Sequence, residues 1–238
     1  MKVLVSFIFL ISWSLLNGCG SGNAFSSLET DDAAEDAIHE LENNNPDKAI
    51  SILESALSSD PENWQLVSIL SAAYAQKHGI SIVDIALSMA ESSSTSLADD
   101  SDQLSQIWPY LPEASEANLT GVSTALDLLR SIPSASRTDA DNFKLALLST
   151  ASVSLRLKSF DTDGDGQLST SELLAMGLDD ATAVLEGLLG ATEALSSISS
   201  SLGESSDQTT ENITQMYTDI QNSEGDNDQE KLTNYLER

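Results

Sequence analysis

The stretch DTDGDGQLSTSE, from Asp161 to Glu172, constrains the fold of this chain more than any other segment. It carries aspartates at its first, third and fifth places, a glycine at its sixth and a glutamate at its twelfth. Four carboxylates crowded into one short turn repel one another unless a cation lies between them. Apolar residues recur at helical spacing on both sides, with Leu157 and Phe160 before the turn and Leu173 after it. The stretch therefore predicts a cation-binding turn between two helices.

The order of residues in this turn resembles the loop of the EF-hand family, a match that covers about thirty residues with its flanks. Calcium takes about six to eight oxygen ligands in a flexible cage, and the resemblance implies that this loop holds it. Gly166 permits the sharp turn, and Leu168, at the eighth place, is the apolar anchor to the core. The implied ligands are the side chains of Asp161, Asp163 and Asp165, the backbone carbonyl of Gln167, Ser169 through a water, and both carboxylate oxygens of Glu172.

Two explanations without metal compete with calcium for the same residues. The run from Ser169 to Glu172 has the pattern of a capping box, which marks the start of a helix. Clusters of aspartate and glycine are also common in surface turns. Neither explanation accounts for three alternating aspartates together with Gly166, Leu168 and Glu172, so we expect a calcium site.

The resemblance also raises the question of a second loop, because EF-hands usually work in pairs. Acidic residues recur at matching intervals between Asp226 and Glu237, but Lys231 takes the place of the glycine and Thr233 that of the apolar anchor. We therefore expect one loop. It packs on the helical body, pairs with a second copy of the chain as a homodimer, or stands alone.

The N-terminal residues predict where the protein resides. Lys2 precedes an apolar run over residues 3–16, which is too short to span a bilayer comfortably and has the length of a signal-peptide core. The sequence LNGC at residues 16–19 resembles the lipobox of bacterial lipoproteins. This resemblance implies a signal peptide over residues 1–18, cleavage before Cys19 and lipid on that cysteine. An ordinary secretory signal with a chance cysteine is the alternative.

The residues around the cysteine refine this prediction. In lipoproteins an aspartate after the cysteine favours retention in the inner membrane, so Gly20 favours the outer membrane, facing the periplasm or the cell surface. Residues 19–30 are small and polar, which is typical of a flexible tether. Cys19 is the only cysteine of the chain, so once it is acylated none remains for a disulfide, a thiolate nucleophile or a metal site.

The charge of the chain narrows the classes of partner. There are 38 acidic and 10 basic residues, which give a formal net charge of -28. This charge argues against nucleic acid as a partner and against electrostatic docking on anionic lipid. It favours cations or a basic partner, with an acidic surface that is only solvated as the alternative.

The remaining sequence predicts an all-α fold, because alternating β-branched and aromatic runs are missing and alanine, leucine, glutamate and serine dominate. Residues 31–91 predict antiparallel helical hairpins that resemble tetratricopeptide repeats, an α-solenoid family. The matching residues are Ala49, Leu53, Ala56, Pro61, Leu70 and Tyr74. Asp36, where a leucine is expected, and Gly79, which comes one place late, depart from the pattern. A generic helical hairpin is the alternative.

Three further segments follow the hairpins. Residues 92–115 are rich in serine and aspartate and then carry two prolines, so they predict a connecting segment. Residues 116–202 predict a helical region that contains the loop at 161–172. Residues 203–238 predict a polar, partly helical tail.

The sequence offers no catalytic constellation. His39 and His78 are typical of surface or helix-end positions, and no phosphate loop, zinc spacing or serine elbow occurs. We expect no enzyme but a lipid-anchored calcium-binding protein of the bacterial cell envelope, an adaptor for an unknown protein or peptide partner, whose C-terminal half calcium stabilises. The alternatives are a small-ligand-binding lipoprotein associated with solute transport and a calcium store with many weak sites.

Overall fold

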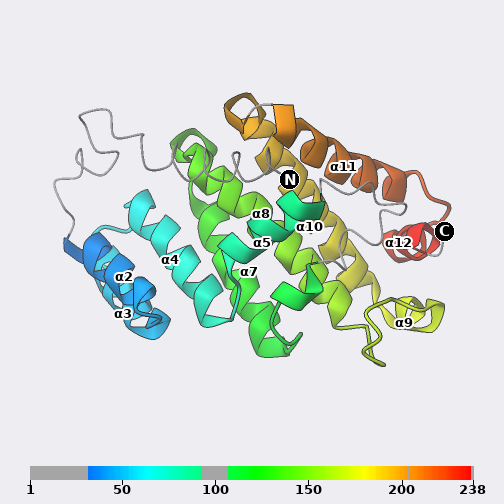
Figure 1. The fold of residues 1–238 in the computed structure, drawn as a ribbon, viewed down its shortest axis with the longest axis horizontal. Helices are drawn as coiled ribbons and strands as arrows, with labels where there is room; N and C mark the ends of the chain where they lie inside the picture. Colours follow the sequence, from blue (N-terminus) through cyan, green and yellow to red (C-terminus); the bar gives the residue numbers. More distant parts are fainter. Residues whose placement is uncertain (1–31, 93–106, 203, 237–238) are drawn as a thin grey trace, which may run out of the picture.

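The structure, a computed structural model, describes residues 32–92, 107–202 and 204–236 (Figure 1). Within these ranges every regular element is a helix and none is a strand, so the predicted all-α class is confirmed. The predicted signal peptide, Cys19 and the tether lie outside the described residues.

The N-terminal part consists of three helices joined by short turns: α2 (Asp32–Glu42), α3 (Pro46–Leu57) and α4 (Trp64–Lys77). Short turns between helices make consecutive helices antiparallel neighbours, and the three lie side by side in Figure 1. The turns follow from local chemistry. Asn44 takes a positive φ of 59° after α2, Pro46 opens α3, and the Asn63 side chain accepts a hydrogen bond from Leu66 N at the start of α4.

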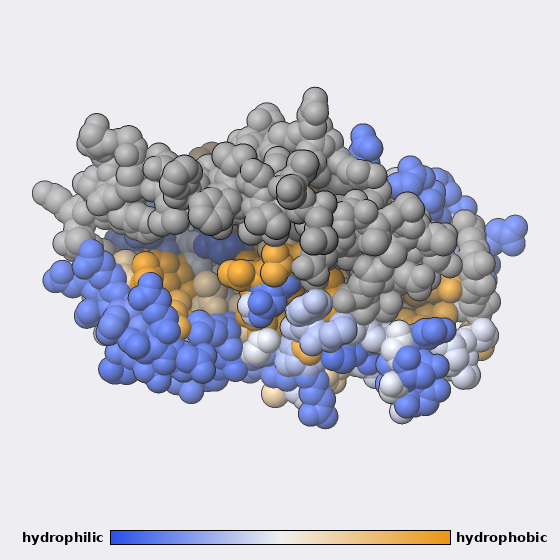
Figure 2. Space-filling view, viewed as in Figure 1, coloured by the Kyte–Doolittle hydropathy of each residue, from blue (hydrophilic) through white to orange (hydrophobic). Residues whose placement is uncertain are grey.

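A small apolar cluster holds these hairpins together. Its fully buried members are small or branched side chains that let the helices approach closely: Ala37, Ala49, Leu53, Leu66, Leu70 and Ala73. Among the residues that resemble a tetratricopeptide repeat, Ala56 and Tyr74 are half-buried and Pro61 is exposed. Asp36, at the place where the repeat carries a leucine, is also exposed. The hydrophilic surface of α2 and α3 is visible at the left of Figure 2.

The C-terminal body is built around α8 (Asp139–Lys158), a helix of 20 residues. It packs against α7 (Glu116–Ser131), α10 (Leu178–Leu202) and α5 (Ile82–Ser92). The helices α8 and α10 run close together because Gly187 has no side chain, and a Cβ there would lie 2.5 Å from Val153 Cγ2. Leu148, Leu155 and Leu188 are buried in this core. This pairing joins the helix that leads into residues 161–172 to the helix that follows α9 (Thr170–Ala175).

The segment after residue 203 belongs to this body. Two helices, α11 (Glu204–Gln221) and α12 (Asp228–Leu236), pack against α10. Their apolar side chains, Ile213, Met216, Ile220, Leu232 and Tyr235, are buried. Spaced three to four residues apart along each helix, they form a narrow stripe inside a polar composition.

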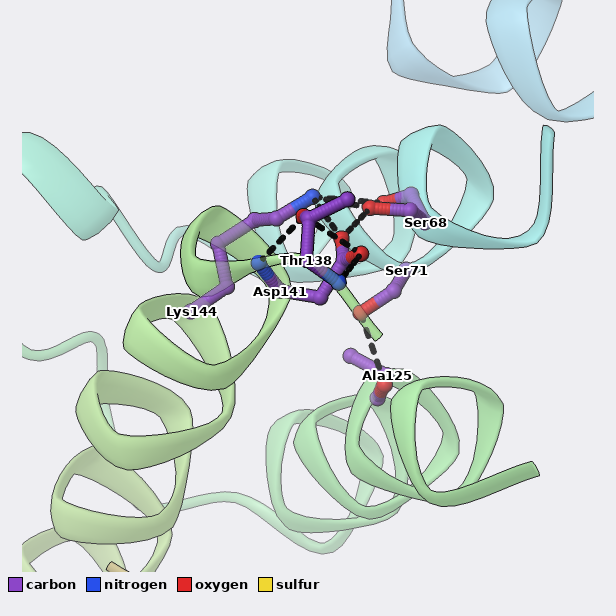
Figure 3. A network of polar contacts seen from close by, with 6 residues as sticks. All are labelled: Ser68, Ser71, Ala125, Thr138, Asp141 and Lys144. Carbon is purple, nitrogen blue, oxygen red and sulfur yellow. Dashed lines mark hydrogen bonds and ion pairs between the residues drawn. The ribbon is translucent and has the colours of Figure 1, made fainter. Parts of the chain in front are cut away.

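A polar network joins the hairpins to the body (Figure 3). The buried Asp141 carboxylate of α8 accepts from the Ser68 hydroxyl of α4 and lies 3.2 Å from Lys144 Nζ. Ser71 of the same α4 donates to the Ala125 carbonyl of α7 over 2.7 Å. Burial works to raise the pKa of Asp141, but hydrogen bonds from Ser68 and Thr138 and the nearby ammonium hold it below its usual value.

None of the described helices combines the length with the apolar composition that crossing a membrane requires.

Candidate metal centre

The loop at residues 161–172 lies between the end of α8 and the short helix α9 (Thr170–Ala175). Its backbone turns twice through left-handed conformations, with φ of 74° at Gly164 and 83° at Gly166. Only glycine adopts such angles at little cost, so the two glycines allow the tight path of the loop. The Asp161 carboxylate fixes both turns, because it accepts hydrogen bonds from Gly164 N at 2.8 Å and Gly166 N at 3.1 Å.

The other two aspartates continue the same pattern. Asp163 accepts from Asp165 N over 3.2 Å, and Asp165 accepts from Gln167 N over 2.8 Å. Each side chain therefore folds back over the loop that carries it. As a result one carboxylate oxygen from each of the three aspartates falls within 4.8 Å of the others. Three predicted ligands thus face a common point.

The carboxylate of Glu172, the last predicted ligand, accepts hydrogen bonds from other residues of the loop. Its carboxylate is buried, with 7% of the residue exposed. One oxygen accepts from Thr162 N at 2.6 Å and Thr162 Oγ1 at 2.8 Å. The other accepts from Ser169 N at 2.9 Å and Ser169 Oγ at 2.8 Å. These hydrogen bonds, those from Ser169 first, lower the pKa of Glu172 to about 2.

The glutamate therefore closes the loop as a crosslink between its two ends. The capping box that the sequence predicted at Ser169 is present, and it uses the carboxylate that the calcium pattern also requires. The Glu172 carboxylate is not part of the cluster of carboxylates that could share a metal ion, which consists of the three aspartates. Ser169, the predicted water-mediated ligand, is exposed and bonded to Glu172, and Gln167 is exposed.

The three aspartates offer carboxylate oxygens as ligand atoms. Carboxylate oxygens are hard ligands that suit calcium or magnesium and do not suit the soft metals that thiolates select. The aspartates are half-buried or exposed and lie at the surface, where an ion can reach them. The geometry fits a divalent cation at the aspartates but does not by itself select calcium.

Two apolar residues attach the loop to the body. Phe160, just before the loop, and Leu168, at its eighth place, are half-buried and pack against the main core. Leu173 of α9 and Met176, which follows this helix, are buried in the same core. The loop is therefore held at a fixed place on the molecule.

The second acidic segment takes part in a helix start. Asn227 caps α12 by accepting from Glu230 N over 3.0 Å, and Glu230 accepts from Asp226 N over 2.7 Å. Asp228 accepts from Thr182 Oγ1 of α10 over 3.1 Å. These carboxylates are engaged in capping and in helix packing.

The two histidines lie away from the aspartates in the fold. The ring of His78 covers Gly121 of α7, where a Cβ would lie 2.1 Å from it, and its Nδ1 lies 3.3 Å from Asn118 Oδ1. His39 is exposed on α2, within 3.1 Å of the Asn43 amide. His78 is used in packing between α4 and α7.

Sequence reasoning missed the partners that hold the loop. Thr162, at the second place, has no part in the calcium pattern, yet it donates twice to Glu172. In the sequence, a hydroxyl side chain between two carboxylates was the feature that could have indicated this role. Arg156 and Lys158, at the end of α8, bond to residues far along the chain, and no local pattern reveals such pairs.

Comparison with protein-family models, with curated proteins and with solved structures gives no match for this chain.

Proposed function

We propose that this protein binds calcium in the loop at residues 161–172 and acts as a lipid-anchored adaptor of the bacterial cell envelope. One observation carries the calcium part. Three alternating aspartates bring their oxygens within 4.8 Å of one another, in a loop that two left-handed glycines allow. The EF-hand resemblance of the sequence supplies the choice of calcium among hard cations.

The bound ion would be held by Asp161, Asp163 and Asp165, with the Gln167 carbonyl, a water on Ser169 and Glu172 completing the oxygen set. A calcium ion there would cancel the repulsion among the aspartates. The loop joins α8 to α9, and both pack in the main core. Calcium would therefore stabilise the C-terminal body.

The adaptor part of the proposal concerns the surface of α2, α3 and α4. Their two lysines are paired with acids, Lys48 with Glu40 at 2.5 Å and Lys77 with Asp47 at 2.7 Å. Further acidic residues on these helices, including Glu35 and Asp36, are exposed. The surface is therefore acidic, which favours a basic protein or peptide segment as partner.

Calorimetric titration of calcium into the metal-stripped chain tests the site, with Asp163→Asn as the variant. Asp163 is exposed and accepts one hydrogen bond, which an asparagine oxygen can also accept, so the variant removes a ligand charge with little effect on the loop. We expect one binding site in the wild type and at least tenfold weaker binding in the variant. Glu186→Gln, an exposed acid on α10, is the control and should bind as the wild type does. Equal affinity in all three proteins would contradict the proposed site.

The lipid anchor is tested separately through Cys19. Cells that express the chain are grown with labelled palmitate, and the label on the purified protein is compared between wild type and Cys19→Ser. We expect label in the wild type alone, with the protein in the membrane fraction. Unlabelled wild-type protein would contradict the anchor and leave the calcium part unaffected.

A further inference from the structure

The helix that enters the loop is fixed to the core by its last residue. Lys158, three places before Asp161, donates from Nζ to three backbone carbonyls: Trp108 O at 2.9 Å, Leu111 O at 3.2 Å and Pro112 O at 3.3 Å. These carbonyls lie in and just after the 3-10 helix η1 (Trp108–Tyr110), where Trp108 O also accepts a hydrogen bond from Leu111 N at 3.1 Å. Trp108 and Leu111 are buried, so the ammonium ties the end of α8 to a fixed part of the molecule.

An ion pair crosses from the same helix to the far side of the loop. Arg156 Nη1, in the last turn of α8, lies 2.7 Å from Asp180 Oδ1, in the first turn of α10. The side chains are 28% and 35% exposed, so solvent screens the pair only in part. The pair holds together two helix ends that the loop and α9 separate in sequence.

The helix that leaves the loop is fixed at its end by α12. The side-chain amide of Gln229 donates to the carbonyl of Met176, the residue that ends α9. Met176 is buried, and α12 packs against both α9 and α10. Gln229 therefore holds the end of α9, a helix of 6 residues, against the body.

We infer that these ties form a brace that keeps α8 and α9 close together around the loop. A cation bound at residues 161–172 therefore stiffens the loop without moving α9 away from α8. The brace is defined by Arg156, Lys158 and Gln229 with their partners. With this brace, ion binding stabilises the C-terminal body and does not expose a buried surface. The inference about calcium rests on the proposed function, whereas the brace itself acts with or without the ion.

Distances between two spin labels test the brace. Nitroxides are placed at Ala140 near the start of α8 and at Ala175 at the end of α9, both exposed, in the full chain with Cys19→Ser, solubilised in mild detergent. The variant Arg156→Gln with Gln229→Ala removes two ties. The matched control, Arg130→Gln with Gln215→Ala, removes an exposed arginine pair and a glutamine hydrogen bond elsewhere on the surface.

In the wild type and the control we expect the same narrow distance distribution in chelator and in calcium. In the variant we expect a broader distribution in chelator and a longer mean distance in calcium. A longer distance in calcium-loaded wild type would overturn the inference, and so would a variant that matches the wild type in both conditions. If the double variant does not fold, judged by circular dichroism, Arg156→Gln alone is measured against Arg130→Gln by the same criteria.

The result separates this inference from the proposed function. If the wild type binds no calcium in the titration, but the brace variant still gives a broader distance distribution in chelator, the calcium site is refuted and the brace is supported. If the wild type binds calcium and its spin-label distance becomes longer in calcium, the site is supported and the brace is refuted.

Discussion

At the scale of single residues, Glu172 shows how one side chain can serve two purposes. Its carboxylate sits at the place where the EF-hand pattern puts a bidentate ligand, yet it accepts four hydrogen bonds from Thr162 and Ser169. Both ends of the loop are therefore joined through a single ionised group. A glutamine in its place presents an NH₂ group toward one of the two donor pairs, where an acceptor is required.

Glu172→Gln should therefore lower the melting temperature even in chelator. The sign of the pH dependence follows from the pKa. Because folding lowers the pKa of Glu172 from 4.5 to about 2, its contribution is complete above pH 4.5 and is lost as the pH falls toward 2. Thermal melts between these pH values should show the wild type and the variant converging as the pH falls. Glu186→Gln should run parallel to the wild type. A constant difference between Glu172→Gln and wild type over this range would contradict the role assigned to the ionised carboxylate.

At the scale of elements, a joint between α4 and α8 fastens the hairpins to the body beside the packing of α4 against α7. It is made by one buried carboxylate, Asp141, which accepts from Ser68 of α4 and from Thr138 at the start of its own helix. Lys144 adds a cation 3.2 Å away and also reaches Ser68. Such a network is costly to break in part, because the polar groups that remain at the buried site lose one of their partners.

Asp141→Ala should lower the free energy of unfolding by about 3 kcal/mol, because it removes the buried carboxylate that pairs with Lys144, accepts from Ser68 and supplies the N3 half of the α8 capping box. Urea unfolding followed by circular dichroism measures this change. The control is Arg130→Gln, which breaks an exposed pair with Asp127 at 3.9 Å and should cost about 0.5 kcal/mol or less. Similar losses in both variants would show that the joint is no more than a surface contact.

At the scale of the whole molecule, two apolar clusters divide the described residues. One cluster lies within α2, α3 and α4, and the other extends from α4 to α12 and includes the residues that flank the loop. The loop that would hold the ion is attached to the second cluster, through Phe160 and Leu168. A ligand that binds only the folded state stabilises the part whose unfolding releases it.

Calcium at 100 times its Kd should therefore add about 2.7 kcal/mol to the stability of the body. Hydrogen exchange should show this as slower exchange of the backbone amides in α8, α9 and α10. The amides of α2 and α3, which belong to the other cluster, should change little. If the Asp163→Asn variant binds tenfold more weakly, calcium at the same concentration should stabilise it by about 1.4 kcal/mol, so its amides should slow by clearly less than those of the wild type. Slowing of equal size in all helices would mean that hairpins and body unfold as one unit.

The elements and the loop could be predicted from the sequence because their causes are local. Apolar residues at helical spacing specify α8 and α10, Asn63 and Thr138 cap the helices they precede, and Gly166 permits the left-handed turn. The alternating aspartates of the loop interact within two to five residues, so their gathering follows from the sequence order. These features need no knowledge of distant contacts.

Only the tertiary structure decided what lies around the loop. Lys158 finds the carbonyls of residues 108–112, Gln229 finds Met176, and Asp141 finds Ser68, in each case across more than forty residues of chain. No local periodicity encodes such pairs, because they depend on how the helices pack. The narrow stripe of α11 and α12 is of the same kind, since its burial depends on the packing of both helices against α10. The sequence by itself determined the helices and the order of oxygens in the loop, and the packing of those helices decided how firmly the loop is held.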